Sequence, residues 1–72
     1  MNSKELAFAV FCIEGIAERL RKNGTEVYKL LKENSEILDS YIITCYDTLH
    51  TQGKEYIVED IVGFMQEKRL VQ

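Results

Sequence analysis

The segment Tyr46-Asp-Thr-Leu-His50-Thr-Gln-Gly53-Lys-Glu-Tyr56-Ile-Val-Glu-Asp60-Ile61 decides the fold expected of this chain. Helical patterns lie on both sides of Gly53, and glycine is the usual residue just past a helix end. Downstream of the glycine, Ile57, Ile61 and Met65 keep the helical period. The segment therefore predicts a helix, a short turn and a second helix.

The last helix has two alternative starts. We expect it to run from about Val58 to Arg69, with residues 54–57 extended. Since Ile57 also fits the helical period, a start at Lys54 is the alternative. Acidic side chains lie near either start, where the positive end of the helix dipole favours them.

Three further helices are expected upstream, over residues 3–22, 25–33 and 35–52. Gly24 is expected to end the first of them in a left-handed conformation. Short turns between helices favour antiparallel neighbours. Each helix begins at a hydroxyl residue that can accept a hydrogen bond from a free backbone amide, namely Ser3, Thr25 or Ser35.

Length and composition agree with a small helical protein. The chain has 72 residues, of which 46% are hydrophobic, and it contains no proline. That length makes one domain, residues 1–72, and absence of proline favours helices. We therefore expect an all-α fold, a compact bundle of about four short helices, that is dimeric or bound to a partner.

The expectation of a partner comes from the first helix, which is apolar nearly all round. Its two apolar stripes are Leu6, Val10, Ile13, Ala17 and Leu20, and Phe8, Phe11, Cys12 and Gly15. Gly15 also predicts a close approach by another helix, since glycine costs a helix about 1 kcal/mol relative to alanine.

A small bundle cannot bury all of this surface, so a second copy or another protein is expected to cover it. Ile43 and Tyr46 lie off the core stripe of the third helix and add to the excess. The residues expected at the interface are Phe8, Phe11, Ile43, Tyr46 and Tyr56.

The two cysteines, Cys12 and Cys45, each lie among apolar residues. We expect buried free thiols in a reducing cytosol, since small secreted domains usually carry more cysteines. A disulfide between them is the alternative if their helices touch. Because no paired cysteine and histidine spacing exists, we expect no zinc site and no other metal or cofactor.

The charge balance argues against nucleic acid as a partner. The net charge is −3, whereas most affinity for nucleic acid comes from neutralising phosphates. Arg19, Arg21 and Lys22 cluster at the end of the first helix, where cations are ordinary partners of the helix dipole.

His50 is the one candidate for acid–base chemistry, because Asp47 lies one turn before it. We expect a structural role instead, with the imidazole meeting free carbonyls at the end of a helix. No nucleophile stands in a recognisable catalytic setting, so we expect no enzyme, no catalytic residue and no small-molecule substrate.

A structural latch is expected around the glycine turn. His50, Thr51 and Gly53 form the turn, which offers hydrogen-bond donors to the start of the next helix. We expect Asp60 to accept a hydrogen bond from this turn and so to hold the third and fourth helices together.

The longest apolar run, Leu6–Ile13, has eight residues and is too short to span a bilayer. It follows a charged pair and precedes no small-residue cleavage site, so it does not fit a signal peptide. A cytoplasmic location without membrane contact is expected.

The chain resembles a bacterial family called domain of unknown function 3791. The resemblance rests on Glu5–Glu14, Glu26–Leu31, Tyr41-Ile42, Tyr46-Asp-Thr-Leu-His-Thr-Gln-Gly53 and Tyr56-Ile-Val-Glu-Asp-Ile61. Family members have no assigned activity, so the resemblance implies no site residue. They are often encoded beside other small proteins, one of them toxin-like, which implies an antitoxin-like or accessory role.

Two functions are therefore expected from the sequence. The first is a small cytoplasmic module that binds itself or another protein, antitoxin-like or accessory to a neighbouring gene product. The alternative is a DNA-binding regulator in which the third and fourth helices form a helix–turn–helix. Glu59 and Asp60 weigh against the alternative, since they would repel phosphates.

Overall fold

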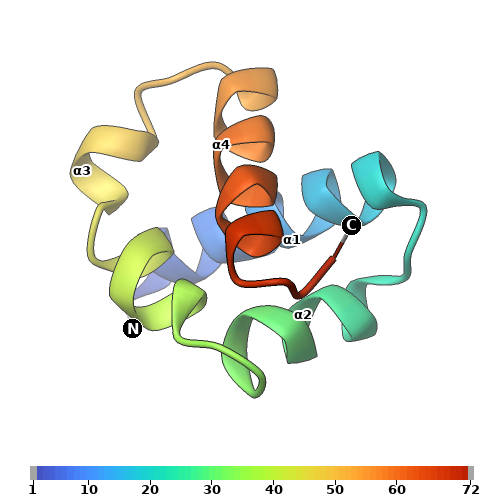
Figure 1. The fold of residues 1–72 in the computed structure, drawn as a ribbon. Helices are drawn as coiled ribbons and strands as arrows, with labels where there is room; N and C mark the ends of the chain where they lie inside the picture. Colours follow the sequence, from blue (N-terminus) through green and yellow to red (C-terminus); the bar gives the residue numbers. More distant parts are fainter. Residues whose placement is uncertain (1, 72) are drawn as a thin grey trace.

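A computed structural model of the protein describes residues 2–71. As Figure 1 shows, helices surround one core: α1 (Ser3–Leu20), α2 (Gly24–Lys32), a π-helix η1 (Leu38–Ile43), α3 (Tyr46–Leu49) and α4 (Lys54–Glu67). No strand occurs within that range. The expectation of an all-α fold is confirmed.

The ends of α1 differ from those expected. Asn2, and not Ser3, is the N-cap: its side chain accepts a hydrogen bond from the Glu5 amide at 2.8 Å, and the Glu5 carboxylate accepts one from the Asn2 amide at 3.2 Å. This reciprocal pair is a capping box. At the other end Arg21, and not Gly24, takes the left-handed conformation, with a φ of 57°.

The start of α2 was also predicted wrongly. The N-cap is Asn23, whose side-chain oxygen accepts a hydrogen bond from the Glu26 amide at 2.8 Å, so Thr25 lies inside the helix. The Asn23 side-chain amide in turn donates to the Glu26 carboxylate at 3.1 Å. Asparagine caps as well as serine or threonine does, and the Glu26 carboxylate gives Asn23 a second bond.

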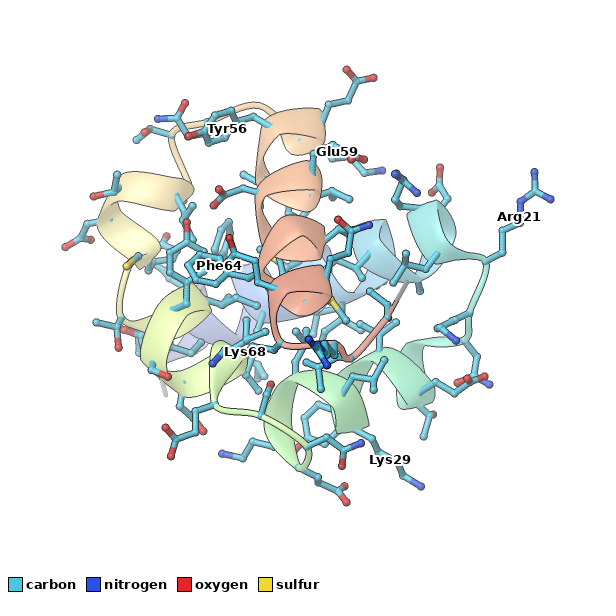
Figure 2. All side chains as sticks on the ribbon, viewed as in Figure 1. Arg21, Lys29, Tyr56, Glu59, Phe64 and Lys68 are labelled. Atoms are coloured by element: carbon cyan, nitrogen blue, oxygen red, sulfur yellow. The ribbon has the colours of Figure 1, made fainter. Side chains whose placement is uncertain are left out.

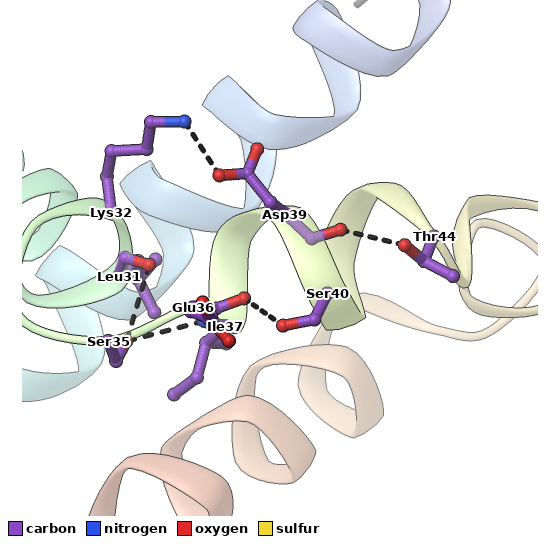
Figure 3. Close-up of polar contacts among 8 residues, drawn as sticks. All are labelled: Leu31, Lys32, Ser35, Glu36, Ile37, Asp39, Ser40 and Thr44. Carbon is purple, nitrogen blue, oxygen red and sulfur yellow. Dashed lines mark hydrogen bonds and ion pairs between the residues drawn. The ribbon is translucent and has the colours of Figure 1, made fainter.

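The predicted third helix is broken into η1, a turn and α3. Figure 3 shows that the hydroxyl of Thr44 donates to the Asp39 carbonyl, at 2.7 Å, and that of Ser40 to the Glu36 carbonyl. A side-chain hydroxyl that donates a hydrogen bond to a backbone carbonyl competes with the backbone amide that would bond to that carbonyl in a regular α-helix. Cys45 then leaves the helical region, with φ −97° and ψ 18°, and α3 starts after it.

Ser35 lies at the break before η1, as expected, but it is no regular N-cap. Its hydroxyl donates to the Leu30 carbonyl at 2.8 Å and accepts a long bond from the Ile37 amide at 3.4 Å. Beside it, Lys32 of α2 forms an ion pair with Asp39 of η1 at 2.6 Å (Figure 3). These contacts connect the end of α2 to the π-helix.

The last helix begins at Lys54, so the alternative start is confirmed and the start at Val58 is wrong. Gly53 is its N-cap and supplies no side-chain hydrogen bond. The helix packs on α1 at Gly15, where a β-carbon would lie 2.7 Å from a methyl group of Val58. The predicted close approach at Gly15 is thereby confirmed.

The core draws on every helix, and no polar side chain is buried in it among residues 2–71. The buried face of α1 is formed by Phe8, Ala9, Cys12, Gly15 and Ile16. The stripe through Leu6 and Val10 is split: these two side chains are exposed, whereas Ile13, Ala17 and Leu20 pack against the core. The small residues at positions 9, 12 and 15 mark the side on which other helices approach.

Candidate protein-binding face

The side of α1 that faces away from the core carries an apolar surface. Leu6 is 55% exposed, Val10 43% and Phe11 41%, and Ala7 between them is also exposed. These four residues, spaced three and four apart on one helix, form a continuous strip, which we call the outer face of α1. Most large apolar side chains elsewhere on the chain are buried or half-buried.

Charged side chains bound the outer face at both ends of the strip. Lys4 lies in the first turn, and Glu14 and Glu18 lie beyond Phe11, all three exposed. An apolar centre with a polar rim is typical of protein-binding surfaces. The two ends of the strip therefore carry opposite charge.

A row of aromatic rings supports the outer face from below. The Phe11 ring stacks on Phe8 with centroids 6.3 Å apart, and Phe8 meets the edge of Tyr46 at 5.3 Å. Tyr46 stacks on His50 at 4.4 Å with the planes 4° apart. We call these four residues the aromatic row. Through Phe8 it connects the Phe11 side chain to Tyr46 at the start of α3.

The residues expected at the interface are only partly brought together. Phe8 is buried and belongs to the core, so its assignment to an exposed interface is wrong. Phe11 is exposed, while Ile43 and Tyr46 are half-buried against the core. Tyr56 is 59% exposed and lies at the start of α4 (Figure 2). The ring contacts found among the described residues do not join it to the aromatic row.

The predicted latch from the glycine turn to Asp60 is wrong. Asp60 accepts a hydrogen bond from the hydroxyl of Tyr41 in η1, and not from the turn after α3. The ring of Tyr41 also packs on Phe64 of α4, with centroids 4.6 Å apart. Burial and this hydrogen bond raise the pKa of Tyr41, because both disfavour the phenolate.

The turn donors are satisfied locally, which is why they do not reach Asp60. The His50 ring nitrogen Nδ1 lies 2.6 Å from the Tyr46 carbonyl, and the Thr51 hydroxyl donates to the Thr48 carbonyl at 2.8 Å. Both bonds close the end of α3. His50 thus has the structural role expected of it, and its ring belongs to the aromatic row.

An open groove of about 440 Å³ lies between α1 and α4 over Gly15 and Val58. Its walls are charged, and the charges are mostly paired. Arg19 meets Glu59 at 2.5 Å, and Lys54 meets Glu18 at 3.9 Å. Exposed pairs of this kind contribute little to stability, but they leave the groove without an unpaired basic group for an anion.

Neither cysteine is in a disulfide. Cys12 is buried, and burial raises its pKa to about 12, so the thiolate is disfavoured. Cys45 is half-buried at the turn before α3. In the part of the chain that the structure describes, no group of three or more histidine, cysteine or acidic side chains is placed to hold a metal ion.

The cationic side chains at the end of α1 do not form one patch. Arg19 is engaged by Glu59, and Lys22 lies 3.9 Å from Glu26. Figure 2 shows Arg21 reaching outward from the end of α1. Among the helices of residues 2–71, none is both long and apolar enough to cross a bilayer.

These features define a small all-α domain that exposes apolar side chains along one face of α1. Residues 7–68 match the family model described as Protein of unknown function (DUF3791), and the chain belongs to that family. The comparisons found no matching curated protein and no matching solved structure. The family identification from the sequence is confirmed, and the family brings no assigned activity with it.

Proposed function

We propose that this protein is a binding module for a second copy of itself or for another protein, and that the outer face of α1 is its contact surface. The observation that carries the proposal is the exposure of Leu6, Val10 and Phe11 on one helix face. Single exposed apolar residues are common, but contiguous ones with a polar rim mark interaction sites.

Folding alone does not account for this surface. The opposite side of α1 already contacts α2, α4 and η1. The capping box at Asn2 and Glu5 holds the first turn in place. Since α1 needs no further apolar side chains to be held, Leu6 and Val10 are available to a partner.

The charge of the molecule favours a protein partner over nucleic acid. The net charge is −3. In the alternative helix–turn–helix reading, α4 would enter the major groove, and it exposes Glu55, Glu59 and Glu67. Carboxylates on that surface would face phosphates, and α3, with four residues, is short for the first helix of such a motif.

The biological role that fits this surface is antitoxin-like, or accessory to a neighbouring gene product, in the cytoplasm. An acidic module with an apolar face complements a basic protein with an apolar groove. We assign no catalysis to His50, because Nδ1 is bonded to a carbonyl and the ring is stacked on Tyr46.

The proposal is tested by Val10→Glu. Self-association and binding of the co-expressed neighbouring gene product are each measured for the wild type and for this variant. We expect Val10→Glu to weaken whichever association the wild type shows by about tenfold or more, because a carboxylate would be buried in an apolar contact. Helical circular dichroism shows that the variant remains folded.

The matched control is Tyr56→Glu, which introduces the same side chain at an exposed aromatic position on α4. We expect it to leave association unchanged. If Val10→Glu binds as the wild type does, or if the wild type binds neither partner, the proposal is wrong. A loss of binding in Tyr56→Glu alone would move the contact surface to α4.

A further inference from the structure

We infer that the occupant of the outer face of α1 is a second copy of this chain, whose α1 packs antiparallel to the first. The inference rests on the proposed function and names its partner. It follows from the order of exposed apolar and charged residues along this one helix face: Lys4, then Leu6, Ala7, Val10 and Phe11, then Glu14.

The outer face is complementary to the outer face of a second copy when the two α1 helices run antiparallel. A two-fold axis that passes midway between Phe8 and Ala9 brings Ala7 level with Val10 of the partner copy. The same axis brings Leu6 level with Phe11 of the partner copy. In the layer of Ala7 and Val10 a small residue meets a larger one, which allows the two helices to approach closely.

The charges at the two ends match under the same axis. Lys4 comes within about one residue of the level of Glu14 of the partner copy, close enough for a long lysine side chain to form an ion pair. Ser3 comes level with the same glutamate and offers a hydroxyl donor. Because the axis is two-fold, each of these contacts occurs twice.

Other arrangements place charge against apolar or like-charged groups. In a parallel pair, Glu14 would face Glu14 and Lys4 would face Lys4, which is repulsive. A slip of one heptad in the antiparallel pair would set Glu14 against Val10 and bury a carboxylate without a partner. The charges therefore favour the antiparallel direction and exclude the heptad slip.

The interface is small, since it uses one face of one helix from each copy. Interfaces at the low end of the size range belong to weak or transient complexes. We therefore expect a dimer with a Kd on the order of 10 to 100 μM, so that monomer and dimer exchange as the concentration changes.

The test is sedimentation equilibrium from about 5 μM to 1 mM, a range that brackets the expected Kd. We expect Lys4→Glu and Glu14→Lys each to weaken the dimer by about tenfold, because two attractive pairs become repulsive. The double variant with both changes restores the pairs with their signs exchanged and should dimerise as the wild type does. Lys29→Glu on α2 is the matched control and should have no effect.

The outcomes separate this inference from the proposed function. A wild type that stays monomeric to 1 mM, yet binds the neighbouring gene product in a way that Val10→Glu abolishes, overturns the self-pairing and leaves the proposed function standing. A dimer that neither charge reversal weakens, or that the double variant fails to restore, overturns the antiparallel register. Loss of every association overturns both.

Discussion

Gly15 of α1 and Val58 of α4 lie so close that a β-carbon on the glycine would be 2.7 Å from a Val58 methyl group. This contact sets the separation of the two longest helices. It also decides which side of α1 faces the core and, in consequence, which side carries Leu6 and Val10 out to solvent.

Gly15→Ala is expected to destabilise the protein, although alanine is the better helix former. Overpacking a tight contact costs about 1–3 kcal/mol, which exceeds the roughly 1 kcal/mol gained in helix propensity. The Tm should fall by several degrees, as measured by thermal denaturation.

Gly63→Ala is the matched control, because a β-carbon there meets nothing within 4 Å. It lies in the middle of α4 and should raise stability by up to about 1 kcal/mol. If Gly15→Ala stabilised the protein as much as Gly63→Ala does, the close approach of α1 and α4 would be refuted.

Tyr41→Phe tests the bond from η1 to α4. It removes the hydroxyl that donates to Asp60 while keeping the ring that packs on Phe64. We expect a loss of about 1 kcal/mol, or several degrees in Tm. Asp60→Ala should cost a similar amount, and the double variant should cost less than the sum of the two. Additive losses would show that the two residues act independently.

The two thiols should differ in reactivity in the folded protein. Cys12 is buried with its pKa raised to about 12, while Cys45 is half-buried near the break before α3. A thiol-specific reagent at neutral pH should modify Cys45 first and Cys12 only as the protein unfolds. Mass spectrometry of digested samples identifies the modified residue, and rapid modification of Cys12 in the folded state would contradict its burial.

The free energy of unfolding should fall at alkaline pH. Burial raises the pKa of Cys12 from 9.0 to about 12, so the unfolded chain releases this proton first as the pH rises through that window. Burial and the bond to Asp60 raise the pKa of Tyr41, which acts in the same direction. Urea midpoints compared at pH 7 and about pH 11 test the expected fall.

A third group adds to this pH dependence. The hydrogen bond and charge of Asp39 raise the pKa of Lys32. The stabilisation from this pair is complete below the pKa of lysine in the unfolded chain and is lost as the pH rises through the raised folded value. Midpoints that increased with pH would contradict the sign for all three groups.

The sequence predicted the positions of the helices better than the residues at which the helices begin and end. Helical period alone located α1, α2 and α4, since apolar spacing survives in any packing. Capping was misread because Asn2 and Asn23 compete with the hydroxyl residues one or two positions later. The capping box of Asn2 with Glu5 was the signal that could have decided the first case.

The break of the third helix was not predicted because it depends on where two hydroxyls point. Ser40 and Thr44 bond to carbonyls of the preceding turn, whereas serine and threonine in a helix can equally face water. The pattern of apolar residues does not indicate whether these hydroxyls bond to the backbone or face water. The Tyr41 to Asp60 bond was missed for the same reason, because it joins segments whose relative position only the packing fixes.

The candidate site was predicted in part. Phe11, which was expected at an interface, is exposed, and part of the apolar excess on the first helix does lie on the surface. The apolar pattern alone did not show which side of α1 faces out, although Ala9, Cys12 and Gly15 held the signal. Small residues at those spacings indicate the side on which helices pack closely, and that side is turned inward.

The most direct test of the central claim is the solvent exposure of the Leu6 and Val10 methyl groups in solution. A soluble paramagnetic agent broadens the NMR signals of exposed methyl groups. We predict that both signals are broadened in dilute protein and become protected as concentration rises or a protein partner is added, while the Tyr56 ring signals stay broadened throughout. Methyl signals that remain fully broadened at every concentration and with every partner would contradict the assignment of this face to binding.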